Sequence, residues 1–178
     1  MLRIRELTTT PSLELFSELV ELLQDAVADG ASLGYTAPPD TKDARNYWTE
    51  VLEGVARGER LLFVATDDHV CAGAVQLHLA VQPSARHRAH VQQLMVHSQF
   101  RRRGIGQALL NALENAAAAR GLTLLVLDVR SGDAAEALCR AAGYEFVGRI
   151  PGYARSTAGR YEPASIYCRR LSAAAGEF

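Results

Sequence analysis

Hydrophobic residues recur along this chain with two different spacings, and each spacing predicts a different kind of element. Between Leu13 and Ala28 they recur at helical spacing, which predicts an amphipathic helix with Ser12 as its N-cap and Gly30 at its end. The stretch 107–120 carries a similar apolar stripe and predicts a long helix. Further helices are expected at residues 41–57 and 133–142, and strands at residues 2–7, 61–66, 70–80, 90–96, 123–129, 144–149 and 165–171.

The order of these elements predicts a mixed sheet. The polar turn at residues 67–69 joins two apolar runs and indicates an antiparallel hairpin. The strand–helix–strand unit from His90 to Val129 requires a right-handed parallel crossover. Its second strand is so densely apolar that we expect both of its faces to be covered, whereas Pro151-Gly152-Tyr153 is expected in a loop. The fold class is therefore α/β: a mixed, mostly antiparallel central sheet with helices on both faces.

Length and charge limit the class of protein. The chain has 178 residues, 48% of them hydrophobic, which suits one domain over residues 1–171 followed by a flexible tail at 172–178. Its 19 basic and 20 acidic residues leave a net charge of −1, which argues against a nucleic-acid partner. No apolar run is long enough for a membrane span or a signal peptide, so we expect a cytoplasmic protein. The three cysteines and the histidines show no metal-ligand spacing, and no metal is expected.

The strongest chemical signal is Arg101-x-x-Gly104-x-Gly106, between a predicted strand and a long helix. A helix N-terminus offers unpaired N–H groups and partial positive charge, and glycines let an anion approach the backbone. The motif therefore indicates a diphosphate cradle, with a simple tight turn as the alternative. A Rossmann site would need a third glycine where Leu109 stands, and a P-loop would need Gly-Lys-Ser/Thr.

Two segments carry a resemblance to a known family. The stretch Val91–Val96, followed by Arg101–Gly106, resembles motif A of the GCN5-related N-acetyltransferases, and Ala135–Tyr144 resembles their motif B. Gly30–Tyr35 and Pro151–Tyr153 are similar to the tabtoxin-resistance type of bacterial acetyltransferase. The resemblance extends over almost the whole chain. It implies a single-domain acyl-coenzyme A N-acyltransferase fold with acetyl-coenzyme A as the acyl donor.

The resemblance also implies where the cofactor lies. The diphosphate would lie over the N–H groups of residues 102–107, and the pantetheine arm would pair with residues 94–96 like an extra strand. A backbone N–H near Leu94 or Met95 would polarise the thioester carbonyl. The implied cofactor residues are Leu94, Met95, Val96, Arg101, Arg102, Arg103, Gly104, Ile105, Gly106 and Gln107.

The candidates for proton transfer are His90, Asp128 and Cys139. Cys139 stands where relatives usually carry a tyrosine that protonates the departing thiolate, and Gly132 stands where many carry asparagine. A thiol with a pKa of ~8.5 suits that task, but a small buried core residue is the alternative. His90 and Asp128 are both candidates for the base, with an inert edge residue and an Arg-paired structural acid as the respective alternatives.

The acceptor side is expected at Ser32, Tyr35, Trp48 and Tyr153, although Tyr35 and Trp48 also suit a core between the first two helices. Arg155 and Arg160 are candidates to attract a carboxylate. We expect a small zwitterionic amine of the amino-acid or toxin type and a role in toxin or antibiotic resistance. A non-catalytic acyl-coenzyme A sensor and a protein or peptide N-acetyltransferase are the alternatives. Monomer and homodimer remain equally open.

Overall fold

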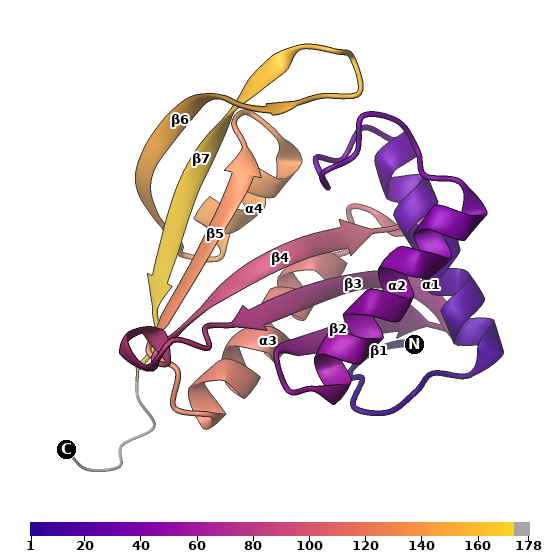
Figure 1. Cartoon of the computed structure of the whole chain (residues 1–178), viewed down its shortest axis with the longest axis horizontal. Helices are drawn as coiled ribbons and strands as arrows, with labels where there is room; N and C mark the ends of the chain where they lie inside the picture. Colours follow the sequence, from indigo (N-terminus) through magenta and orange to yellow (C-terminus); the bar gives the residue numbers. More distant parts are fainter. Residues whose placement is uncertain (173–178) are drawn as a thin grey trace.

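A computed structural model of the chain describes residues 1–172, in which seven strands form one sheet in the order β1-β2-β3-β4-β5-β7-β6 (Figure 1). Only β4 and β5 run parallel, and all other neighbours are antiparallel, which confirms the predicted crossover. The expected tail from residue 172 onward lies outside the described residues except for its first position. The strands are β1 (Leu2–Glu6), β2 (Arg60–Asp67), β3 (Val70–Leu79), β4 (Arg88–Val96), β5 (Leu124–Arg130), β6 (Glu145–Arg155) and β7 (Tyr161–Arg170).

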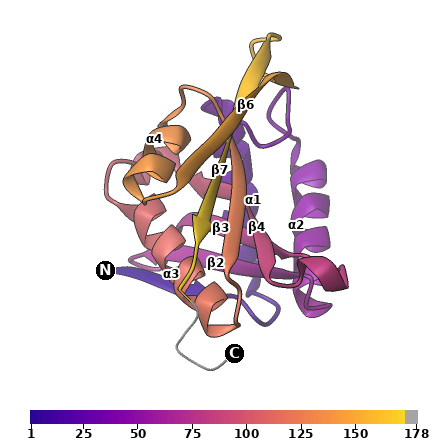
Figure 2. The ribbon, with the colours of Figure 1, turned by 90° about the vertical axis from the view of Figure 1, so that its left-hand side faces the viewer.

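Helices cover both faces of the sheet, as predicted. Helices α1 (Leu13–Ala28) and α2 (Thr41–Ala56) lie on one face, and α3 (Ile105–Ala119) and α4 (Ala134–Ala141) lie on the other (Figure 2). Ser12 caps α1 as expected, because its hydroxyl accepts a hydrogen bond from the N–H of Leu15 at 3.2 Å. Two single turns of 3-10 helix, η1 (Pro83–Ala85) and η2 (Ser98–Phe100), flank β4. None of the helices within residues 1–172 has the length and apolar character needed to cross a bilayer.

The alternation of strand residues produces two apolar cores. Leu61, Phe63 and Leu125 point toward α3, while Leu62 and Val64 pack under α1 and α2. Each helix pair therefore buries its own face of the same sheet, and the sheet connects the two cores.

The sheet opens between β4 and β5. Their ladder consists of three pairs, from Arg88 with Leu124 to His90 with Val126, after which the strands diverge (Figure 1). A β-bulge lies at the same point: Ala74 of β3 faces Met95, while Gln76 faces Gln92. Three steps along β4 therefore match two along β3. Gln93, inside the bulge, has a φ of 53°. A bulge bends and twists its strand, which accounts for the divergence.

Two expectations about the strands were wrong. Residues 151–153 belong to β6 rather than to a loop. A proline is tolerated there because β6 is the edge strand and is bulged between Ile150 and Ala154. In β5 only Leu125 and Leu127 are fully buried, whereas Asp128 is exposed. The second face of β5 borders the opening rather than a helix.

Candidate active site

Two adjoining cavities occupy the opening between β4 and β5. The larger, of about 610 Å³, lies between the end of α1, the second half of β4, the start of α3 and α4. The smaller, of about 260 Å³, is bounded by the α1–α2 loop and the β6–β7 hairpin. Their shared wall consists of Ser32, Leu33, Val91, Gln92, Gln93, Asp128, Val129 and Arg130. A ligand in one cavity therefore meets a ligand in the other at the bulge.

The turn before α3 has the features of an anion cradle. Gly104 is the N-cap of α3 with a φ of 76°, a left-handed conformation that favours glycine. The first helical hydrogen bond runs from the N–H of Ala108 to Gly104. Within the described part of the chain, the amides of residues 102–107 donate no hydrogen bond. Consecutive unpaired N–H groups at the positive end of a helix suit a diphosphate.

Gly106 determines how closely α4 approaches this turn. A Cβ at this position would lie 2.9 Å from Cδ2 of Leu138, so glycine allows α4 to pack directly against the first turn of α3. Leu138 and Gly106 both line the larger cavity. The residues present thus fit a cofactor with a diphosphate at one end and an extended arm beside β4.

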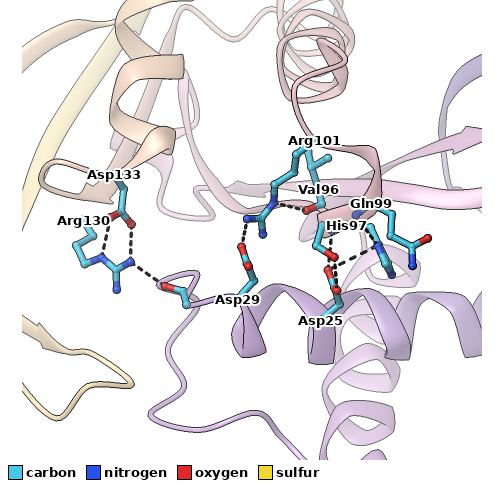
Figure 3. Close-up of polar contacts among 10 residues, drawn as sticks. Asp25, Asp29, Val96, His97, Gln99, Arg101, Arg130 and Asp133 are labelled. Carbon is cyan, nitrogen blue, oxygen red and sulfur yellow. Dashed lines mark hydrogen bonds and ion pairs between the residues drawn. The ribbon is translucent and has the colours of Figure 1, made fainter.

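Of the expected cofactor residues, only Arg103 is absent from the lining of the larger cavity. Its guanidinium pairs with Asp67 at 3.6 Å and stacks 5.3 Å above the Phe100 ring, so the expected contact with the cofactor is not supported. Arg101 does line the cavity. Its Nε donates to the carbonyl of Val96 at 3.3 Å, and its Nη1 pairs with the carboxylate of Asp29 (Figure 3).

The structure separates the two candidates for the base. Asp128 is exposed and lines both cavities. No hydrogen bond or ion pair holds its carboxylate within residues 1–172, and neighbouring Arg130 pairs instead with Asp133 at 2.9 Å. His90 lies opposite His78, at the closed end of the β4–β5 ladder, and lines neither cavity.

Cys139 borders the larger cavity but is only 2% exposed. Burial, together with the negative charge of Glu136, raises the pKa of its thiol to about 12. Proton transfer from such a thiol to a thiolate of ordinary pKa ~8.5 is unfavourable by on the order of 10³. The geometry therefore favours Cys139 as a small core residue rather than as the acid.

Two of the four expected acceptor residues reach a cavity. Ser32 lines both, and Tyr153 lines the smaller one. Trp48 is fully buried in the core under α1 and α2, and Tyr35 packs edge-on against Tyr47 with 6.4 Å between ring centroids. Both residues therefore follow the alternative given for them, a core between the first two helices.

Arg155 and Arg160 are also absent from both linings. Arg155 donates to the carbonyl of Gly159 at 3.2 Å, and Arg160 pairs with Glu162 at 3.3 Å. Both guanidiniums thus contact other residues of the β6–β7 hairpin. The cation that lines the smaller cavity is Arg130 instead.

The sequence did not indicate the residues that hold the α1–α2 loop, which borders the smaller cavity. Arg130 at the end of β5 donates to the carbonyl of Gly30 at 2.7 Å, and Gln93 donates to the carbonyl of Leu33 at 3.5 Å. The one available signal was the polar pair Gln92-Gln93 inside an otherwise apolar strand. Because Arg130 acts on a segment 100 residues away, nothing in its local sequence indicates that contact.

Comparison with known proteins agrees with this geometry. Residues 19–144 match the model of the acetyltransferase (GNAT) family. An uncharacterized N-acetyltransferase from the hisH-hisA intergenic region of Azospirillum brasilense is 35% identical over 118 residues, which cover 64% of this chain and 67% of that protein.

Solved structures share the fold at lower identity. A ribosomal-protein-alanine N-acetyltransferase from Brucella melitensis superposes with a TM-score of 0.78 at 23% identity, covering 95% of this chain and 99% of the other. A phosphinothricin acetyltransferase from Sinorhizobium meliloti, in complex with acetyl-coenzyme A, gives 0.77 at 18% identity, covering 99% and 92%.

Proposed function

The chain belongs to the acetyltransferase (GNAT) family and is thus an acetyl-coenzyme A-dependent N-acetyltransferase. We propose that its acceptor is the primary amine of a small molecule, and that this molecule binds in the smaller cavity. One observation carries the proposal. Asp128 places its carboxylate on the wall shared by the two cavities, and no group within residues 1–172 pairs with it. An acceptor ammonium held there would lie beside the end of the cofactor arm.

The cofactor is assigned to the larger cavity. The amides of residues 102–107 and the side chains of Arg101 and Arg102 would hold its diphosphate, and residues 94–96 would pair with its arm. When bound, acetyl-coenzyme A supplies an acetyl group activated as a thioester. A backbone N–H at Leu94 or Met95 would be placed to donate to the carbonyl oxygen of the thioester and to stabilise negative charge there.

Asp128 handles the acceptor proton in this scheme. Its carboxylate holds the ammonium and passes a proton to water, which leaves a neutral amine to attack. Because burial keeps the Cys139 thiol protonated, we assign protonation of the departing thiolate to water rather than to Cys139.

We propose an amino-acid-like amine as the acceptor and toxin or antibiotic resistance as the role. The smaller cavity offers two acids, Asp128 and Glu162, and one cation, Arg130, in a space suited to a small zwitterion. The likeness of Gly30–Tyr35 to the tabtoxin-resistance type supports the same class. The phosphinothricin acetyltransferase with the same fold is compatible with it.

The test measures initial rates of thiol release from acetyl-coenzyme A with matched concentrations of amino-acid-like amines, polyamines, aminoglycosides and peptides. We expect the amino-acid-like amines to react fastest, and Asp128→Asn to slow the reaction of every amine in the panel. Faster turnover of peptides would favour a protein N-acetyltransferase. Coenzyme A binding without turnover of any amine would contradict the catalytic assignment of this site.

A further inference from the structure

Arg101 has one negative partner within the protein and would gain a second from a cofactor in the larger cavity. Its guanidinium pairs with Asp29 (Figure 3), while its position at the start of the β4–α3 turn makes it an expected ligand of the cofactor diphosphate. We propose that Asp29 is a positioning residue that occupies Arg101 in the free enzyme and yields it to the diphosphate, and so weakens coenzyme A binding. This inference rests on the proposed cofactor site.

Because of its position in α1, the carboxylate of Asp29 needs a cation from another segment of the chain. Asp29 is the C-cap of α1, where the helix dipole is negative and where an acid is electrostatically disfavoured. The last turn of α1 carries no basic residue of its own. Arg101, from a segment 72 residues away, supplies the missing positive charge.

The ion pair between Arg101 and Asp29 can be replaced at low cost by a contact between Arg101 and the diphosphate. Its side chains are 39% and 46% exposed, so solvent screens the attraction and its loss costs little stability. The Nε of Arg101 remains fixed by the carbonyl of Val96 at 3.3 Å, so the guanidinium stays beside the turn when Asp29 leaves. A diphosphate offers more acceptor oxygens and more charge than one carboxylate and displaces it.

The carboxylate of Asp29 and a bound diphosphate would nevertheless both lie near the cradle formed by the amides of residues 102–107. Asp29 lines the larger cavity together with Gly104 and Gly106, so its charge repels any phosphate bound to the amides of residues 102–107. Asp29 thus lowers the affinity for the cofactor and, equally, for the coenzyme A product, which must leave before the next turnover.

The segment that follows Asp29 connects the cofactor cavity to the acceptor cavity. Asp29 is followed by Gly30, whose carbonyl is held by Arg130 at 2.7 Å, and then by Ser32 on the shared wall. Release of Asp29 removes one contact on the cofactor side, while Arg130 still holds Gly30 and Asp25 still accepts hydrogen bonds from Ser98 at 2.7 Å.

The test is titration calorimetry of coenzyme A with the full chain and its variants. Asp29→Asn should lower the Kd by on the order of tenfold at low salt, and the gain should shrink in 1 M salt. Glu21→Gln, which removes an equal charge from the exposed face of α1 two turns away, should leave the Kd unchanged. Pantetheine, which lacks the diphosphate, should bind Asp29→Asn and wild type equally.

A double-mutant cycle isolates the pair. Arg101→Gln should weaken coenzyme A binding, and adding Asp29→Asn in that background should restore less affinity than it adds to the wild type. Unchanged or weaker binding by Asp29→Asn, with thermal unfolding like that of wild type, overturns the inference while the cofactor site survives. Failure of the wild type to bind coenzyme A would instead overturn the proposed site itself.

Discussion

At the scale of single residues, the opening in the sheet separates side chains that look equivalent in the sequence. His90 and Asp128 both occupy strands beside the opening, but only Asp128 borders the cavities. His90 stands where β4 and β5 are still paired, next to His78. We therefore assign the role of base to Asp128 because of its exposure to the cavities and not because of its residue type.

Asp128→Asn is therefore expected to lower kcat on the order of 10²-fold, because the amide neither attracts an ammonium nor accepts its proton. His90→Ala should change kcat by less than about threefold, in line with a group that exchanges no proton in the reaction. Steady-state kinetics on the best acceptor checks both variants. The reverse ranking would return the role of base to His90.

Cys139 provides a second residue-scale prediction. With a pKa of about 12, its thiol does not ionise between pH 6 and 9, so Cys139→Ala should leave the pH–rate profile in that range unchanged. Loss of the buried sulfur should reduce the free energy of unfolding by roughly 0.5–1.5 kcal/mol. A tenfold fall in kcat at unchanged stability would show that the thiol takes part in catalysis.

At the scale of elements, one buried carboxylate connects α4 to β7. Glu136 accepts the N–H of Gly132 at 2.6 Å and the hydroxyl of Tyr167 at 2.9 Å, and Arg140 pairs with it at 3.1 Å. These contacts, led by the Gly132 amide, hold the pKa of Glu136 down to about 2. They position the helix that carries Leu138 and Cys139 against the larger cavity.

The pH dependence of stability follows from that low pKa. The folded value lies below the unfolded value of ~4.3, so the contribution of Glu136 is present above about pH 4 and is lost as the pH falls toward 2. Glu136→Gln should cost about 1–2 kcal/mol at pH 7 and flatten the acid limb of the stability curve. Denaturant unfolding between pH 2 and 7 measures both effects, and parallel curves for the two proteins would contradict the assignment.

The two ends of α3 offer a matched pair of glycines. Gly104 and Gly121 have φ values of 76° and 77°, and a Cβ would meet nothing within 4 Å at either. Alanine at either position should therefore cost about 1–2 kcal/mol of backbone strain. Only Gly104→Ala should also weaken coenzyme A binding, because only Gly104 adjoins the cradle. Equal losses of affinity would indicate a general effect of destabilisation.

At the scale of the whole molecule, the cofactor is expected to stabilise the fold. The β4–β5 ladder contains three residue pairs, so the two halves of the sheet are joined by few strand contacts. Coenzyme A at 100 times its Kd should add about 2.7 kcal/mol to the free energy of unfolding. Hydrogen exchange should slow at residues 91–96 and 102–107, and slowing confined to other segments would place the ligand elsewhere.

Most of the fold was predictable because local patterns encode it. Helical periodicity identified α1 and its cap at Ser12, and the glycine motif located the turn before α3. Long-range geometry was not predictable. The ion pair of Arg103 with Asp67 and the bond of Arg130 to Gly30 join segments whose proximity only the folded sheet creates. The expectation that Trp48 lies on the acceptor side was wrong for the same reason, because only the folded structure shows that its side chain is buried in the core.

The bulge in β4 has a consequence for how this enzyme changes over evolutionary time. Before Gln93, the residues facing α3 are Ala89 and Val91; after it, they are Leu94 and Val96, so the alternation has shifted by one position. A substitution alters which side chain occupies a position, whereas this shift depends on the number of residues. A point mutation can therefore change a side chain on the walls of the opening, whereas only an insertion or a deletion changes the number of residues that produces the bulge.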